Sequence, residues 1–260
     1  MRQVRTGLDV EVDGATLEFR YGAGVRGPLA EFRTLDAIRA SLLDPQCSGP
    51  SPVYSIAMDV RREEDEDALK ASYLLCGVVA YAAGKLGKEP VRSQGHVHAT
   101  APHSGWSPPE LYEIWEGNAI IYAQQRTTDD PGRCVAVTAG PGEKVVVPPG
   151  WAHAVINADT KQRMVFGAWC DRQYGFEYAG VRAHGGLAYF PIVKADGAIE
   201  WILNGRYQAA DLEQRASRSY PELGLDAVEP IYSQYHNDPK SVEWVAEPQQ
   251  FAELWPRFAP

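Results

Sequence analysis

The sequence predicts an all-β protein built around a jelly-roll barrel, extended by strands near the N-terminus and by short helices near the C-terminus. Between residues 72 and 193, short apolar runs are separated by turn residues roughly every eight to twelve positions, as in barrels and jelly rolls. Several runs also alternate apolar and polar residues, which is typical of strands with one buried face. Because 260 residues suit one domain of this kind, we expect a single domain over residues 1–260 with its core barrel at about residues 50–200.

The segment before the barrel, residues 1–49, is expected to contribute strands and one short helix. Residues 10–21 alternate on both sides of a turn and predict a first hairpin, while residues 35–43 carry apolar side chains at helical spacing. Residues 53–60 predict the next strand. The acidic stretch that follows, residues 61–67, is expected to cap the edge of the barrel.

The segment after the barrel, residues 201–260, is expected to be a helical extension. The pattern of residues 209–219 predicts a helix. Residues 248–255 predict a final short helix that places Phe251, Leu254 and Trp255 on one face.

The composition excludes several kinds of partner. With 34 acidic and 25 basic residues, the net charge of -9 offers no electrostatic surface for nucleic acid or an anionic membrane. Residues 1–14 are too charged for a secretory signal, and no later run reaches the length of a transmembrane segment. We therefore expect a cytoplasmic protein. Its four widely spaced cysteines, which suggest no disulfide framework, are expected to be reduced and structural: Cys47, Cys76, Cys134 and Cys170.

Strand geometry turns two histidines to the same face of one strand, and it turns a glutamate and a tyrosine to the same face of the next strand. His96 and His98 are two residues apart, so on a strand both rings point into one space. Residues 110–116 predict the next strand, in which Glu110 and Tyr112 share a face. A Gly-Asn turn and a returning strand at residues 119–123 follow.

A third histidine lies on a later strand. Residues 144–147 form a short apolar run, a Pro-Pro-Gly turn follows, and residues 152–157 alternate so that His153 and Asn157 face the same side. Three imidazoles and one carboxylate form a mixed nitrogen and oxygen set that suits a divalent transition metal such as iron, manganese, zinc or nickel. We expect one such ion per chain.

These blocks resemble the two sequence motifs of the cupin superfamily. The first reads Gly95, His-x-His, a spacer, Glu110, six residues and Gly117, and its spacer of eleven residues reads as an inserted loop expected at the barrel mouth. The second block fits without a gap through Gly142, Pro148, Gly150, His153 and Asn157. The resemblance implies the cupin double-stranded β-helix.

Over roughly residues 75–185 the chain is similar to the cupin-type phosphoglucose isomerases of archaea and some bacteria. The matching residues are Gly84, Lys85, Gly87, Glu89, Ser93, Gly95, His96, His98, Glu110, Tyr112, Pro148, Pro149, Trp151, Ala152, His153 and Asn157, with a weaker match at Glu177 and Tyr178. This resemblance implies a metal-dependent aldose-ketose isomerase that interconverts glucose 6-phosphate and fructose 6-phosphate.

The resemblance also implies residue roles. It assigns the metal to His96, His98, Glu110 and His153, the sugar phosphate to Ser93, Gly95, Tyr112 and Tyr178, and the catalytic roles to Glu110 and Tyr112. Three positions depart from the family pattern: Phe176 replaces a histidine, Trp169 replaces a tyrosine, and Val79 replaces a threonine that contacts phosphate.

The chemistry leaves alternatives open. Four protein ligands leave two octahedral positions for the C1 and C2 oxygens of an open-chain sugar, and a carboxylate beside them can carry a proton. Phe176 makes a hydride shift a rival route, and His103 in the inserted loop could supply a proton instead. A metal-dependent dioxygenase and a non-catalytic metal- or sugar-binding cupin are the alternative functions.

Outside the motifs, His184 and His236 read as ordinary hydrogen-bonded histidines. Because exposed sheet edges favour pairing between chains, we also expect a homodimer to which the first 30 residues contribute.

Overall fold

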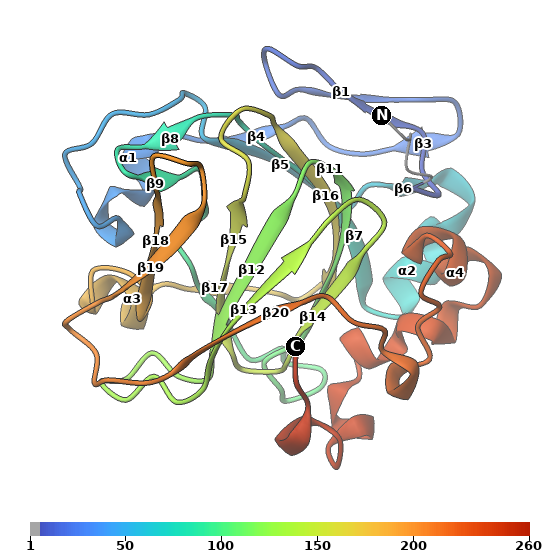
Figure 1. Ribbon diagram of the computed structural model, residues 1–260. Coiled ribbons are helices and arrows are strands. Elements are labelled where there is room, and N and C mark those ends of the chain that lie inside the picture. The colour runs from blue at the N-terminus through green and yellow to red at the C-terminus, as the bar shows by residue number, and fades with distance from the viewer. Residues whose placement is uncertain (1–5) are drawn as a thin grey trace.

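The computed structural model describes residues 6–260, and two facing β-sheets form its centre (Figure 1). Their strands are β4 Glu31–Arg33, β5 Tyr54–Met58, β7 Leu74–Tyr81, β11 Glu110–Glu116, β12 Ala119–Gln124, β13 Cys134–Ala139, β14 Lys144–Val147, β15 Ala152–Asn157, β16 Met164–Asp171 and β20 Leu212–Ala216. The larger sheet has the order β14-β11-β16-β7-β5-β4, and the smaller sheet has the order β15-β12-β13-β20. This arrangement is the predicted cupin double-stranded β-helix, with an N-terminal strand extension and short C-terminal helices.

Short two-stranded ladders and short helices surround the barrel. The ladders pair β1 Val10–Val12 with β2 Phe19–Tyr21, β3 Val25–Arg26 with β6 Arg61–Arg62, β8 Lys85–Leu86 with β9 Glu89–Pro90, β10 Val97–His98 with β17 Phe176–Glu177, and β18 Tyr189–Val193 with β19 Ile199–Leu203. The α-helices are α1 Leu35–Ile38, α2 Glu66–Ala71, α3 Ala179–Ala183 and α4 Ile231–Asn237. The 3-10 helices are η1 Arg39–Ser41, η2 Glu63–Asp65, η3 Pro221–Leu223, η4 Pro239–Val245, η5 Pro248–Phe251 and η6 Trp255–Arg257.

Several predicted elements are confirmed. The hairpin at residues 10–21 consists of β1 and β2, and the strands predicted at 110–116, 144–147 and 152–157 keep those bounds as β11, β14 and β15. Within residues 6–260, none of the helices combines the length and the apolar character that crossing a bilayer requires. Residues 1–5, which belong to the segment expected to contribute to a dimer, lie outside the described residues.

Both faces of the larger sheet are covered, which explains why β7 and β16 are apolar runs rather than alternating ones. Every residue of these two strands is buried. One face packs into the barrel interior through residues such as Phe166, while the other packs against the C-terminal segment, where Trp169 meets Tyr232 and Tyr235. Figure 1 shows the C-terminal helices along this outer side. A strand buried on both faces has no polar face to alternate with.

The smaller sheet is also covered on its outer face. Tyr122 of β12 packs there against Tyr189 and Trp201 of the β18-β19 hairpin, with ring centroids 6.5 and 5.6 Å away. The four cysteines are buried free thiols, which agrees with the structural role expected for them.

The helix predicted at residues 209–219 is wrong, because residues 212–216 form β20. This strand pairs in parallel with β13 and completes the edge of the smaller sheet. Its residues favour helix intrinsically, but pairing at a sheet edge outweighs a propensity difference of well under about 1 kcal/mol per residue. Arg133 and Glu213 add an ion pair of 3.1 Å across the two strands.

The last predicted helix, at residues 248–255, is instead divided into η5 and η6. The backbone hydrogen bonds of this segment join residues three apart, as from Ala252 to Gln249 and from Leu254 to Phe251, so the turns are of the 3-10 type and not of one α-helix. Phe251, Leu254 and Trp255 nevertheless pack against the core, as the predicted apolar face requires.

One buried carboxyl group should make stability depend on pH. Glu113 of β11 lies 3.8 Å from the Lys144 amine and accepts hydrogen bonds from the Trp115 indole and the Ile231 backbone amide. Burial raises the pKa of Glu113 to about 7, although Lys144 opposes the shift. Because this pKa is higher than in the unfolded chain, the folded state holds the proton more tightly. Its stabilising effect is full below about pH 4.5 and is lost as pH rises through about 7.

We therefore expect Glu113→Gln to become more stable relative to the parent protein as pH rises from 5 to 8. At about 1.4 kcal/mol per pKa unit, the difference in unfolding free energy should shift by roughly 2 to 3 kcal/mol. Urea titrations of both proteins at several pH values measure it. A difference in unfolding free energy that does not change with pH would show that the pKa of Glu113 is the same in the folded and unfolded protein.

Candidate metal and substrate site

Four side chains from three parts of the barrel converge at one end of its interior. We call His96, His98, Glu110 and His153 the metal-ligand cluster; one ligand atom from each lies within 4.8 Å of all the others. Glu110 begins β11 and His153 lies in β15. The His96 and His153 backbones exchange hydrogen bonds of 3.1 and 2.9 Å, which places the segment of His96 and His98 beside β15.

Backbone carbonyls orient two of the imidazoles. The Nδ1 atom of His98 lies 3.0 Å from the Pro108 oxygen, and that of His153 lies 3.0 Å from the Trp151 oxygen. An Nδ1 atom that donates to a carbonyl directs Nε2 at the cluster and leaves its lone pair for a metal ion, as in metal-binding histidines.

The nitrogen atoms of the cluster fit a cation. Within residues 6–260, Nε2 of His96 is buried without a hydrogen-bond partner, and Nε2 of His98 is buried with only the Glu110 carboxylate near it, at 3.3 Å and without hydrogen-bond geometry. Burial and the neighbouring His153 and His98 rings hold the pKa of His96 well below its usual value, so this ring is neutral. Buried lone pairs without partners are costly unless a cation or donor meets them, so the group could hold a divalent metal.

Glu110 is ionised and held in place. Its Oε2 atom accepts the Tyr112 hydroxyl at 2.6 Å and lies 2.9 Å from His153 Nε2 and 3.3 Å from His98 Nε2. Burial alone would raise the pKa of Glu110, but His153 and His98 hold it well below its usual range. Burial and Glu110 raise the pKa of Tyr112, which therefore remains a donor.

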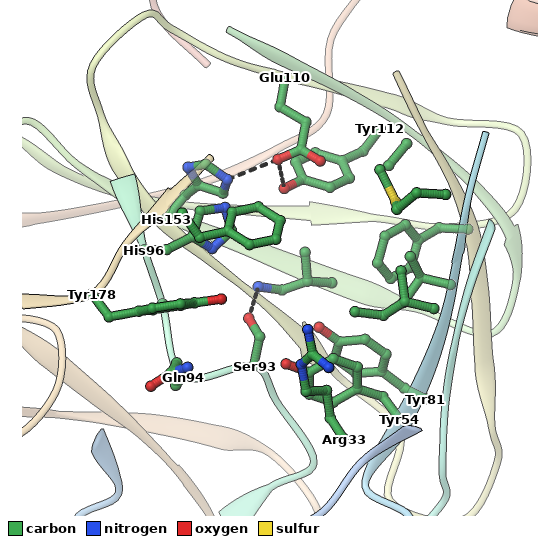
Figure 2. Close-up of a pocket in the computed structure, with 18 residues that line it drawn as sticks. Arg33, Tyr54, Tyr81, Ser93, Gln94, His96, Glu110, Tyr112, His153 and Tyr178 are labelled. Atoms are coloured by element: carbon green, nitrogen blue, oxygen red, sulfur yellow. Dashed lines mark hydrogen bonds and ion pairs between the residues drawn. The ribbon is translucent and has the colours of Figure 1, made fainter. Parts of the chain in front are cut away.

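A pocket opens from the metal-ligand cluster into the barrel interior and is partly open to solvent. Figure 2 shows the cluster residues His96, Glu110 and His153 at one end. The opposite end, which we call the Arg33 end, is formed by Arg33, Tyr54, Tyr81 and Ser93. The rest of the lining is mainly apolar and includes Ile56, Met58, Val79, Val155 and Phe166.

All four residues predicted to bind substrate line this pocket: Ser93, Gly95, Tyr112 and Tyr178. The Ser93 hydroxyl oxygen accepts the Val155 amide at 3.1 Å, which fixes its position against β15. Gly95 has φ +88°, and a Cβ there would lie 2.7 Å from the Leu187 side chain. Only glycine therefore suits this turn.

The three departures from the family pattern have different structural meanings. Phe176 lines the pocket with its ring centroid 4.4 Å from that of His96, and it offers no group that can carry a proton. Val79 also lines the pocket. Trp169 does not, because it points into the outer core, and the residue of β16 that faces the pocket here is its neighbour Ala168. The tyrosine that the family pattern expects is thus absent from the pocket wall.

The inserted loop is held at the end of the barrel, away from the pocket wall. His103 Nε2 lies 2.5 Å from the Asp171 carboxylate, and its ring stacks on Tyr73 at 4.1 Å. In the described part of the chain, no residue between 99 and 109 lines the pocket. His103 therefore fastens the loop to β16 and does not face the reacting end.

The histidines outside the motifs behave as expected. His184 contacts the Gly180 carbonyl and Asp129, and His236 contacts Asp65. Neither lines the pocket.

The sequence did not indicate four polar pocket residues: Arg33, Tyr54, Tyr81 and Gln94. Tyr54 and Tyr81 stack at 4.7 Å from adjacent strands, but β7 is an apolar run without alternation, so the sequence does not mark Tyr81 as facing the pocket. Arg33 lies far upstream of the motifs, and no local pattern marks it.

Comparison with known proteins agrees with this architecture. The family described as glucose-6-phosphate isomerase (GPI) matches residues 35–207, a span that includes every residue of the cluster and nearly all of the pocket. The chain belongs to this family.

Two archaeal glucose-6-phosphate isomerases are similar to this chain over most of their length. The glucose-6-phosphate isomerase of Thermococcus kodakarensis is 24% identical over 206 residues, which cover 78% of this chain and 96% of that protein. The glucose-6-phosphate isomerase of Pyrococcus horikoshii is 26% identical over 200 residues, which cover 75% of this chain and 96% of that protein. Among solved structures, hazelnut vicilin from Corylus avellana is 10% identical with a TM-score of 0.36, covering 50% of this chain and 33% of vicilin.

Proposed function

We propose that this protein is a metal-dependent aldose-ketose isomerase that interconverts glucose 6-phosphate and fructose 6-phosphate. One observation carries the proposal: in residues 6–260, Glu110 is both a member of the metal-ligand cluster and the sole carboxylate lining the pocket. A base beside a cation is the arrangement that proton transfer next to a carbonyl needs. Membership of the isomerase family supports the same reaction.

His96, His98, His153 and Glu110 would hold one divalent ion, of which iron, manganese, zinc and nickel all suit the ligands. When bound, such an ion polarises a carbonyl and stabilises negative charge on its oxygen. Glu110 accepts the proton from C2 of the open-chain aldose and returns it to C1, while the hydroxyl proton of O2 passes to O1 as C2 becomes the carbonyl carbon. Tyr112 positions Glu110 through Oε2, while Oε1 makes no hydrogen bond within the described residues and is free to take the proton.

The apolar middle of the pocket contributes by excluding water. Phe176, Phe166 and Val155 present no donor or acceptor to the reacting carbons. Apolar side chains around the reacting carbons strengthen the electrostatic effect of Glu110 and the imidazoles.

The test is to incubate metal-loaded protein with a panel of aldose and ketose phosphates in deuterated water and to follow products by NMR. We expect fructose 6-phosphate from glucose 6-phosphate, with deuterium entering at C1. The same product without deuterium would indicate the hydride shift. Failure to isomerise any sugar phosphate would contradict the proposal. Oxygen consumption would instead indicate a dioxygenase, and binding of a sugar without isotope exchange would indicate a binding protein.

We further propose a cytoplasmic homodimer that pairs through the N-terminal edge of the larger sheet. β4 is the last strand of that sheet, and Phe32 within it is 41% exposed, while Leu29 just before it is 94% exposed. An unpaired edge with exposed apolar side chains is suited to association. Light scattering should give a particle mass of twice the chain mass of 28.6 kDa. The substitution Phe32→Glu should weaken the pairing and lower the measured particle mass. A monomer at working concentrations would refute the dimer.

A further inference from the structure

Arg33 is the one lysine or arginine side chain that lines the pocket within residues 6–260. It ends β4, the edge strand of the larger sheet, and β4 pairs with β5 so that Arg33 lies opposite Tyr54. Figure 2 shows its guanidinium group at the end of the pocket opposite Glu110 and His153. The side chain is 23% exposed, so its charge is partly shielded from bulk water.

Hydroxyl groups surround this charge. Figure 2 shows the Arg33 guanidinium beside Tyr54 and Tyr81, and Tyr178 lines the same pocket. Burial raises the pKa of Tyr54 and of Tyr178, and Arg33 opposes the shift at both phenols. Tyr81 stacks on Tyr54, and Ser93 lies at the same end of the pocket. A guanidinium ringed by hydroxyl donors is a recognition site for an oxyanion.

We infer that Arg33 binds the phosphate group of the substrate and thereby sets which carbons reach Glu110. This inference rests on the proposed function, because a sugar phosphate has one end that reacts and one end that is a dianion. Because no other lysine or arginine lines the described pocket, no second side chain of this kind competes for the phosphate. Arg33 is thus a specificity-determining residue that acts at a distance from the reacting carbons.

A purely structural role for Arg33 makes a different prediction. The guanidinium also forms an ion pair with Glu31, whose side chain is 66% exposed. If Arg33 served only this pair, removing either partner would have the same effect. If Arg33 binds phosphate, Glu31 competes with the ligand, and its removal should leave binding unchanged or make it tighter.

The experiment compares Arg33→Gln and Glu31→Gln with a matched control, Arg26→Gln. Arg26 also forms an ion pair, with Glu63, but it does not line the pocket. We expect Arg33→Gln to raise KM for glucose 6-phosphate by roughly 10- to 100-fold with kcat nearly unchanged, as loss of a charged hydrogen bond would. Calorimetry with inorganic phosphate should show a similar loss of affinity. Glu31→Gln and Arg26→Gln should show neither effect.

Two results would overturn the inference: an unchanged KM in Arg33→Gln, or the same rise in KM in Glu31→Gln. The phosphate titration separates this inference from the proposed function. If the parent protein isomerises no sugar phosphate yet binds inorganic phosphate through Arg33, the function fails and the anion site stands. If the parent protein turns over glucose 6-phosphate and Arg33→Gln binds phosphate equally well, the function stands and the role of Arg33 fails.

Discussion

Glu110→Gln is expected to lose isomerase activity by a factor of roughly 10³ or more, even with metal restored. The amide keeps the shape of the side chain and can still accept the Tyr112 hydroxyl bond, but it cannot exchange a proton at neutral pH and coordinates metals weakly. Initial rates should be measured together with metal content, so that lost chemistry is distinguished from lost metal.

Tyr112→Phe is the matched control for this prediction. Its hydroxyl donates to Glu110 Oε2 in the structure, so its removal should loosen the carboxylate without removing it. We expect a decrease in kcat of roughly tenfold, in line with one hydrogen bond to a charged group. An active Glu110→Gln protein with normal uptake of solvent deuterium would show that another group carries the proton.

His153→Ala is expected to abolish stable metal binding and activity with it. His153 Nε2 lies at the centre of the metal-ligand cluster, 2.9 Å from Glu110, and its Nδ1 is fixed by a backbone carbonyl. Loss of such a preorganised ligand should weaken metal affinity by more than about 100-fold, since even the loss of an outer partner costs 10- to 100-fold. Metal analysis after dialysis should fall from near one ion per chain to a small fraction.

His184→Ala is the control, because His184 contacts Gly180 and Asp129 outside the pocket. It should keep its metal. Chelation of the parent protein should also lower its thermal stability, and added divalent ion should restore it, because a ligand that binds only the folded state stabilises that state. A parent protein that takes up no divalent ion would contradict the metal assignment.

The strands that carry the cluster were predictable because their signals are local. In β11 and β15, alternation fixes which side chains share a face, and glycine and proline mark the ends. This was enough to place Glu110 beside Tyr112 and to turn His153 inward. By contrast, β20 owes its conformation to β13, a partner about 78 residues earlier, and its own residues favour a helix.

The far end of the pocket could not be predicted for a similar reason. Arg33 reaches the interior because β4 follows β5 at the end of the sheet order, and that order is a property of the whole fold. Trp169 shows the limit of motif matching: a shift of one residue along β16 exchanges a pocket position for a core position, and here it is Ala168 that faces inward.

The two ends of the pocket have separate origins in the chain, which has a consequence for how such an enzyme can change. Glu110 of the cluster lies on β11, inside the larger sheet, and His153 lies on β15, a six-residue strand of the smaller sheet. Arg33 belongs to a three-residue strand on the periphery. New preferences for the anionic tail of a ligand can therefore arise from a few peripheral residues, while the machinery for moving a proton stays intact. A protein with this fold can therefore change its substrate while it keeps the same reaction.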